Sequence, residues 1–112
     1  MSLVNEQWEF LKDLAKLILF AEANGFILTG GELARPIEMQ KLYLATNRST
    51  TMNSLHLKRL AQDYNIFKDG KLTYDISTVK ILGDYWESLN PKNKWGGNWH
   101  NFKDVPHFQR TV

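Results

Sequence analysis

Apolar residues recur along this chain with the two periods that distinguish helices from strands. Between residues 3 and 24 they return at steps of three and four, which predicts an amphipathic helix that ends at Gly25. We expect its packed face to consist of Trp8, Leu11, Leu14, Ala15, Ile18 and Leu19. A later helix is predicted to begin at its cap Asp75 and to stop at Asn90-Pro91. Its apolar stripe consists of Val79, Leu82, Trp86 and Leu89.

Shorter apolar runs predict an antiparallel sheet. The run 26–29 indicates a strand that Gly30 and Gly31 end, and Asp69-Gly70 between two apolar stretches predicts a hairpin over residues 64–74. A last strand is expected at 107–109. A further helix is expected from Pro36 to about Ala45, because proline suits the first helical position. The prediction is one α+β domain over residues 1–112, with a small antiparallel sheet and about three helices.

Composition narrows the classes of protein that fit this chain. With 112 residues, of which 43% are hydrophobic and 12% aromatic, the chain is long enough for one core and too short for two ordinary domains. Cysteine is absent, so no disulfide can form. A net charge of +2 favours approach to anionic surfaces but is far below that of a dedicated nucleic-acid binder. We expect neither a secretion signal nor a membrane span.

Two segments carry side chains of the kind that hold a catalytic metal ion. His56 and Asp63 lie in the first segment, and Asp104 and His107 lie in the second. Two imidazoles and two carboxylates suit a catalytic zinc site, in which three protein groups hold the metal and a free carboxylate acts as a base. A continuous helix would separate His56 and Asp63 by about 10.5 Å, so the chain must turn between them if both bind one ion. Pro106 favours an extended approach to His107.

Other interpretations of the same residues stay open. The two histidines would also suit a structure in which they are hydrogen-bonded and partly buried, with the aspartates as turn formers or helix caps. His100 is a rival ligand, because His56, His100 and His107 would form a three-histidine site. A stacking platform for single-stranded nucleic acid is a further alternative, built from Trp95, Trp99, Lys94 and Lys103. We favour Trp95 and Trp99 as walls of a cleft.

The segments Ser54-x-His56, Trp95-Gly96-Gly97 and Asp104-Val105-Pro106-His107-Phe108 resemble motifs of the zinc D-alanyl-D-alanine carboxypeptidase family. This family includes the vancomycin-resistance D,D-dipeptidases and the L-alanyl-D-glutamate endopeptidases that serve as phage endolysins. Its signature S-x-H-x-x-G-x-A-x-D is similar to the segment with Ser54, His56, Ala61 and Asp63. Its second signature is similar to Asp104-Val105-Pro106-His107-Phe108. Its W-G-G motif is similar to Trp95-Gly96-Gly97, and its R-[ST]-x-x-x-Q segment is similar to Arg35-Pro36-x-x-x-Gln40. The motifs follow the family's order and span residues 35–108.

The resemblance implies a hedgehog/D,D-peptidase-like zinc peptidase fold and a set of roles. One catalytic Zn²⁺ would be held by His56, Asp63 and His107. Asp104 would act as the catalytic base and Arg35 would stabilise the oxyanion. Substrate contacts are implied for Ser54, Gln40 and Trp95.

The implied substrate is the stem peptide of peptidoglycan. The chain would act as an L-alanyl-D-glutamate endopeptidase or a D-alanyl-D-alanine carboxypeptidase, and the phage members of the family favour the endopeptidase. We expect a monomeric phage or prophage endolysin that lyses cells, binds no nucleic acid and does not insert stably into membranes. It would be made in the host cytoplasm without a signal peptide, exported with a holin-type helper, and active at the cell wall or periplasm. A catalytically degenerate module that binds the wall or nucleic acid is the alternative.

One position departs from the family pattern. The first signature has a glycine where this chain has Arg59. If that glycine adopts a positive φ in a tight turn, a non-glycine residue there costs about 1 kcal/mol or more unless the turn is rebuilt. The ligand assignment of Asp63 depends most on this turn.

Overall fold

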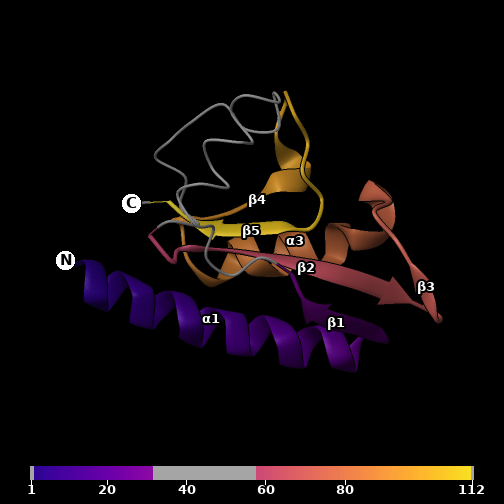
Figure 1. Cartoon of the computed structure of the whole chain (residues 1–112), viewed down its shortest axis with the longest axis horizontal. Helices are drawn as coiled ribbons and strands as arrows, with labels where there is room; N and C mark the ends of the chain where they lie inside the picture. Colours follow the sequence, from indigo (N-terminus) through magenta and orange to yellow (C-terminus); the bar gives the residue numbers. More distant parts are fainter. Residues whose placement is uncertain (1, 32–57, 112) are drawn as a thin grey trace.

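The computed structural model describes residues 2–31 and 58–111, in which two helices pack against an antiparallel sheet (Figure 1). The first helix, α1 (Leu3–Ala23), begins at Ser2, whose hydroxyl accepts a hydrogen bond from the Asn5 amide, and it is followed by Gly25 with a φ of 80°. The second, α3 (Ile76–Leu89), begins at Asp75, whose carboxylate accepts a 3.0 Å hydrogen bond from the Thr78 amide. Both predicted helices, including the Asp75 cap, are therefore confirmed.

The strands are β1 (Phe26–Gly30), β2 (Ala61–Lys68), β3 (Lys71–Leu72), β4 (Asn93–Trp95) and β5 (His107–Arg110), with a 3-10 turn η1 (Gly96–Asn98) after β4. All pairings are antiparallel, in the order β1-β2-β5-β4, and β3 pairs with β2. In Figure 1 the C-terminal strand β5 accordingly lies between β2 and β4. The α+β class, the strand at 26–29 and the strand at 107–109 are confirmed.

Local chemistry explains the hairpin between β2 and β3. Asp69 and Gly70 have φ values of 52° and 76°, and a tight type I′ turn requires positive φ at both central residues.

Strand β4 was not predicted. The helix predicted from Pro36 to Ala45 lies outside the described residues, and the described part contains two α-helices. Neither of them is both long and apolar enough to span a membrane.

The helices cover one face of the sheet and build the core there. Successive side chains of a strand point to opposite faces, so Tyr64 and Phe108 point to the same side as the helices. The Trp86 ring of α3 makes edge contacts with Phe10 of α1 at 5.7 Å and with Phe108 of β5 at 6.1 Å between ring centroids. The predicted stripe of α3 is confirmed, since Val79, Leu82 and Trp86 are fully buried and Leu89 packs against them. The opposite face of the sheet carries Asp63 and His107.

The predicted packed face of α1 is confirmed at Leu14 and otherwise wrong. Its buried apolar residues are Phe10, Leu14, Leu17 and Ala21. The residues expected there are mostly exposed, with exposed fractions of 59% for Trp8, 52% for Leu11, 47% for Ile18 and 67% for Leu19. Helix α1 has apolar residues on two sides, and the periodicity cannot tell which side packs. The buried side is the one that also carries Glu6 and Asp13.

The buried carboxylates of Glu6 and Asp13 hydrogen-bond α1 to the end of the sheet. The Glu6 carboxylate accepts hydrogen bonds from Arg110 Nε at 2.6 Å and Lys92 Nζ at 2.8 Å. Asn93 Nδ2 donates to Asp13 at 3.0 Å. The hydrogen bonds from Arg110 and Lys92 lower the pKa of Glu6 from 4.5 to about 2. Polar partners far away in the sequence therefore select the face of α1 that packs.

We predict that Glu6→Gln removes a pH-dependent part of the stability. Because folding depresses the Glu6 pKa, its contribution is fully present above the unfolded value near 4.5 and is lost as the pH falls toward about 2. Urea unfolding at a series of pH values should show that the wild-type free energy of unfolding falls more steeply across this window than that of Glu6→Gln. Glu9→Gln, which alters an exposed pair with Lys12, should follow the wild-type curve closely. Parallel curves for wild type and Glu6→Gln would contradict the prediction.

Candidate metal centre and active site

Strand register brings Asp63 and His107 face to face. In the antiparallel pair of β2 and β5, Asp63 is directly opposite His107, and the Tyr64 amide donates to the Pro106 carbonyl at 3.0 Å beside them. Side chains of directly opposed residues project from the same face of a sheet at close range. The Asp63 carboxylate accordingly lies 3.0 Å from Nδ1 of His107.

A turn before β5 places Asp104 next to this pair. The His107 amide donates to the Asp104 carbonyl at 3.1 Å, and the Asp104 amide donates to the Gly96 carbonyl at 3.0 Å. A Cβ atom at Gly96 would overlap the Asp104 carbonyl oxygen, so this close approach needs a glycine. The Asp104 carboxylate lies 3.9 Å from His107 Nδ1. The Trp-Gly-Gly motif thus has a packing role in positioning Asp104.

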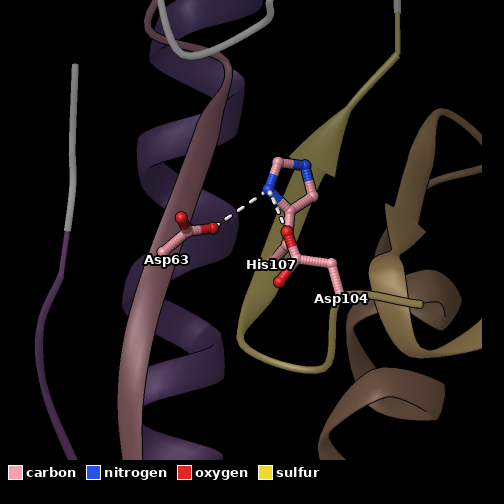
Figure 2. Close-up of side chains that lie close together, drawn as sticks. All are labelled: Asp63, Asp104 and His107. Atoms are coloured by element: carbon pink, nitrogen blue, oxygen red, sulfur yellow. Dashed lines mark hydrogen bonds and ion pairs between the residues drawn. The ribbon is translucent and has the colours of Figure 1, made fainter. Parts of the chain in front are cut away.

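The three side chains form a compact group on the face of the sheet opposite the helices. Figure 2 shows the imidazole of His107 with its Nδ1 turned toward both carboxylates, one from β2 and one from the loop before β5. One ligand atom from each residue lies within 4.8 Å of the other two. Exposure of the side chains rises from 8% for His107 through 22% for Asp63 to 44% for Asp104. The group therefore opens toward solvent on the side of Asp104.

Gln109 determines which nitrogen of His107 can bind a cation. Its Oε1 lies 2.7 Å from His107 Nε2, and an amide oxygen can only accept, so Nε2 carries a proton. The Nδ1 atom then faces carboxylate oxygens, a contact that is favourable when a proton or a metal ion lies between them. Burial lowers the pKa of His107, but the hydrogen bond and charge of Asp63 outweigh it, so that the pKa is raised. Imidazole and carboxylate donors suit Zn²⁺, and these residues fit a divalent metal ion.

Trp95 and Trp99 take different roles. The Trp95 side chain is fully buried and its Nε1 donates to the Val105 carbonyl at 2.8 Å, so Trp95 has no surface to offer a substrate. This corrects its predicted substrate contact and removes it from the predicted stacking platform. The Trp99 ring lies 5.1 Å from the His107 ring and is partly buried, as expected for a wall of the site.

The other predicted site residues are only partly within the described chain. His100 is exposed and does not belong to the group of potential metal ligands found among the described residues. The residues outside the described part are His56, Arg35, Gln40 and Ser54. Gln109 was not predicted as a site residue. Its position two residues after His107 on a strand places both side chains on the same face of the sheet.

Arg59 adopts the backbone conformation that the family's glycine was expected to provide. Its φ is 56°, in the left-handed region, and the turn at Lys58 and Arg59 leads directly into β2. The side chain of Gln7 in α1 donates to the Lys58 carbonyl at 2.9 Å and helps to hold this turn. The departure from glycine therefore leaves Asp63 opposite His107.

An antiparallel α+β fold that presents one imidazole and two carboxylates on one face of its sheet offers the donor set that metal-dependent hydrolases use. The model of the D-alanyl-D-alanine carboxypeptidase family matches residues 47–110, and the chain belongs to this family.

Two similar proteins agree with this assignment. The chain is 34% identical over 99 residues to the L-alanyl-D-glutamate peptidase of Listeria phage A118, an alignment that covers 84% of this chain and 34% of that protein. The chain thus spans about a third of the length of this relative. The crystal structure of the Serratia marcescens L-Ala D-Glu endopeptidase ChiX matches with a TM-score of 0.72 and 25% identity, covering 89% of this chain and 79% of that one.

We predict that Arg59→Gly stabilises the protein. A non-glycine residue in the left-handed region costs about 1 kcal/mol, and glycine relieves that cost. Urea unfolding should show a higher free energy of unfolding, by less than about 1 kcal/mol because glycine also adds freedom to the unfolded chain, with an unchanged dependence on urea concentration. Lys58→Gly is the matched control, and it should destabilise the protein because it adds freedom to the unfolded chain without relieving strain. A loss of stability in Arg59→Gly would contradict this account of the turn.

Proposed function

We propose that this chain is a zinc peptidase that hydrolyses the stem peptide of peptidoglycan at an L-alanyl-D-glutamate bond. The observation that carries the proposal is the group of Asp63, Asp104 and His107, whose ligand atoms lie within 4.8 Å of one another. The phage and bacterial relatives named as L-alanyl-D-glutamate peptidases support this choice of bond. The family's own description, D-alanyl-D-alanine carboxypeptidase, makes cleavage of the terminal D-alanine the second candidate.

The proposed metal ligands are His107, Asp63 and His56. His107 would bind through Nδ1, because its Nε2 is engaged by Gln109. Asp63 is the better carboxylate ligand of the two, since it lies on a strand, is less exposed and is closer to Nδ1. His56 is assigned from the signature that it shares with Asp63. When bound, zinc would lower the pKa of a water molecule toward neutrality and polarise the scissile carbonyl.

Asp104 is proposed as the general base. It is the most exposed of the three residues and lies on a loop at the open side of the group. From there its carboxylate can take a proton from the attacking water and return it to the leaving amine. Arg35 is proposed to stabilise the oxyanion, and Ser54 and Gln40 to contact the substrate, on the strength of the motifs that carry them.

The same proposal covers the setting in which the protein works. A phage or prophage origin and action at the cell wall are supported by the similarity to the Listeria phage A118 peptidase. Export with a holin-type helper stays part of the proposal. A monomer without a nucleic-acid partner stays part of the proposal.

The proposal is tested by metal analysis of the purified protein, followed by incubation with purified peptidoglycan and mass spectrometry of the released fragments. We expect about one zinc ion per chain and new amino termini on D-glutamate. Release of free D-alanine alone would establish the carboxypeptidase instead. Bound metal without any cleavage would show a degenerate member of the family, and absence of metal binding would reject the proposal.

We predict that Asp104→Asn separates metal binding from turnover. The amide cannot accept the proton of the attacking water, so peptidoglycan hydrolysis should fall by a factor of about 100 or more while zinc stays bound. Asp63→Asn and His107→Ala should instead lose the metal, and His100→Ala should resemble the wild type in both measurements. Zinc content and the rate of fragment release, measured on all four variants, check this division. Hydrolysis retained in Asp104→Asn would reject its role as base.

We also predict that Gln109→Leu weakens zinc binding. Without the acceptor on Nε2, the imidazole is free to change tautomer and orientation, and loss of such a partner costs about 10- to 100-fold in metal affinity. Competition with a coloured chelator measures the zinc dissociation constant directly. Gln109→Glu keeps an acceptor at the same position and should retain or increase the affinity. An unchanged dissociation constant in Gln109→Leu would exclude this positioning role.

A further inference from the structure

A groove lies beside Asp104, which also belongs to the proposed metal centre. Its volume is about 430 Å³, and its lining residues are Tyr74, Ile76, Lys103, Asp104, Val105 and Pro106. They come from two segments that are distant in sequence, the connection between β3 and α3 and the turn that leads into β5. The groove and the candidate active site therefore share one residue, Asp104.

The lining is mostly apolar and carries one cation, Lys103, besides the carboxylate of Asp104. Lys103 donates to the Gly97 carbonyl at a long 3.4 Å, and among the described residues it forms no ion pair. Asp75, which lies between the lining residues Tyr74 and Ile76, turns its carboxylate to its own helix, where Ser77 and Thr78 donate to it. The lysine ammonium is thus available to an anionic ligand in the groove.

We propose that this groove binds the residue on the amine side of the scissile bond and that Lys103 recognises the carboxylate of that residue. The inference rests on the proposed function and extends it to substrate specificity. Because Asp104 returns its proton to the leaving amine, the residue that carries this amine must lie against Asp104. Asp104 also lines the groove, which is therefore the site that we assign to that residue.

The lining suits an acidic residue with an aliphatic stem. In an L-alanyl-D-glutamate bond the amine belongs to D-glutamate. This residue has two methylene groups and two carboxyl groups, of which one continues the peptide chain and the other, the α-carboxylate, is free. The methylene groups would pack on Ile76 and Tyr74, whose side chains keep exposed fractions of 38% and 47%. The carboxylate would form a charge-assisted hydrogen bond with Lys103. Lys103 also offsets the repulsion between this carboxylate and Asp104.

The experiment compares two synthetic stem peptides that differ only in D-glutamate, whose α-carboxylate is free in one and converted to a primary amide in the other. We expect the zinc-loaded wild-type protein to favour the free acid about tenfold in kcat/KM, mainly through KM, because a hydrogen bond to a charged group is lost in the amide. Lys103→Met keeps the aliphatic stem and removes the charge. It should lower kcat/KM about tenfold for the acid and leave the amide unchanged.

Lys16→Met is the matched control. It makes the same change in net charge on the exposed side of α1, away from the groove, and should keep the wild-type preference. Equal losses for both peptides in Lys103→Met, or an unchanged preference, would overturn the proposal while leaving the peptidase function intact.

Equilibrium binding separates the two levels of inference. Titration calorimetry of the same two peptides, with Asp104→Asn added to both the wild-type and the Lys103→Met protein to prevent turnover, measures the preference without cleavage. If no peptide is hydrolysed, the proposed function fails, and a preference for the free acid that is lost in Lys103→Met would still support the groove. If hydrolysis occurs and neither binding nor kcat/KM depends on the carboxylate, the groove proposal is rejected alone.

Discussion

The register of β2 against β5 is the constraint on which the site depends. Asp63 pairs with His107 and Gln62 pairs with Phe108, so a slip of one residue would exchange the faces of β5 and turn His107 into the core. The core resists this slip, because Phe108 is fully buried between the rings of Tyr64 and Trp86. Apolar packing on the helix face thereby fixes the distance between an imidazole and a carboxylate on the other face.

Two glycines allow neighbouring segments to approach and hydrogen-bond the backbone of the two aspartates, Asp63 and Asp104. The Gly31 amide donates to the Asp63 carbonyl at 2.9 Å, and the Gly96 carbonyl accepts from the Asp104 amide at 3.0 Å. At each glycine a Cβ would collide with the backbone of the aspartate. Since a metal centre tolerates only small errors in ligand position, these close contacts are part of the site although neither glycine has a functional group.

Features that depend on local chemistry were predictable from the sequence, whereas features that depend on distant partners were not. The Asp69-Gly70 hairpin and the Asp75 cap follow from neighbouring residues alone. The packed face of α1 depends on the bond from Glu6 to Arg110, 104 positions away, which the apolar period cannot reveal. The group of Asp63, Asp104 and His107 was expected from family motifs rather than from spacing, and Trp95 was misplaced because its burial depends on the contact with Gly83 of α3.

Strand β5 connects the stability of the fold to the geometry of the site. Its residues alternate between faces, so His107 and Gln109 form the site while Phe108 and Arg110 join the core. Arg110 is bound at 2.6 Å to Glu6, which lies on the first helix. A buried ion pair contributes little net stability once desolvation is counted, but breaking it leaves an uncompensated charge. The pair thereby also holds β5 in one position relative to α1, so that a helix with no residue in the group of Asp63, Asp104 and His107 contacts the strand that carries His107.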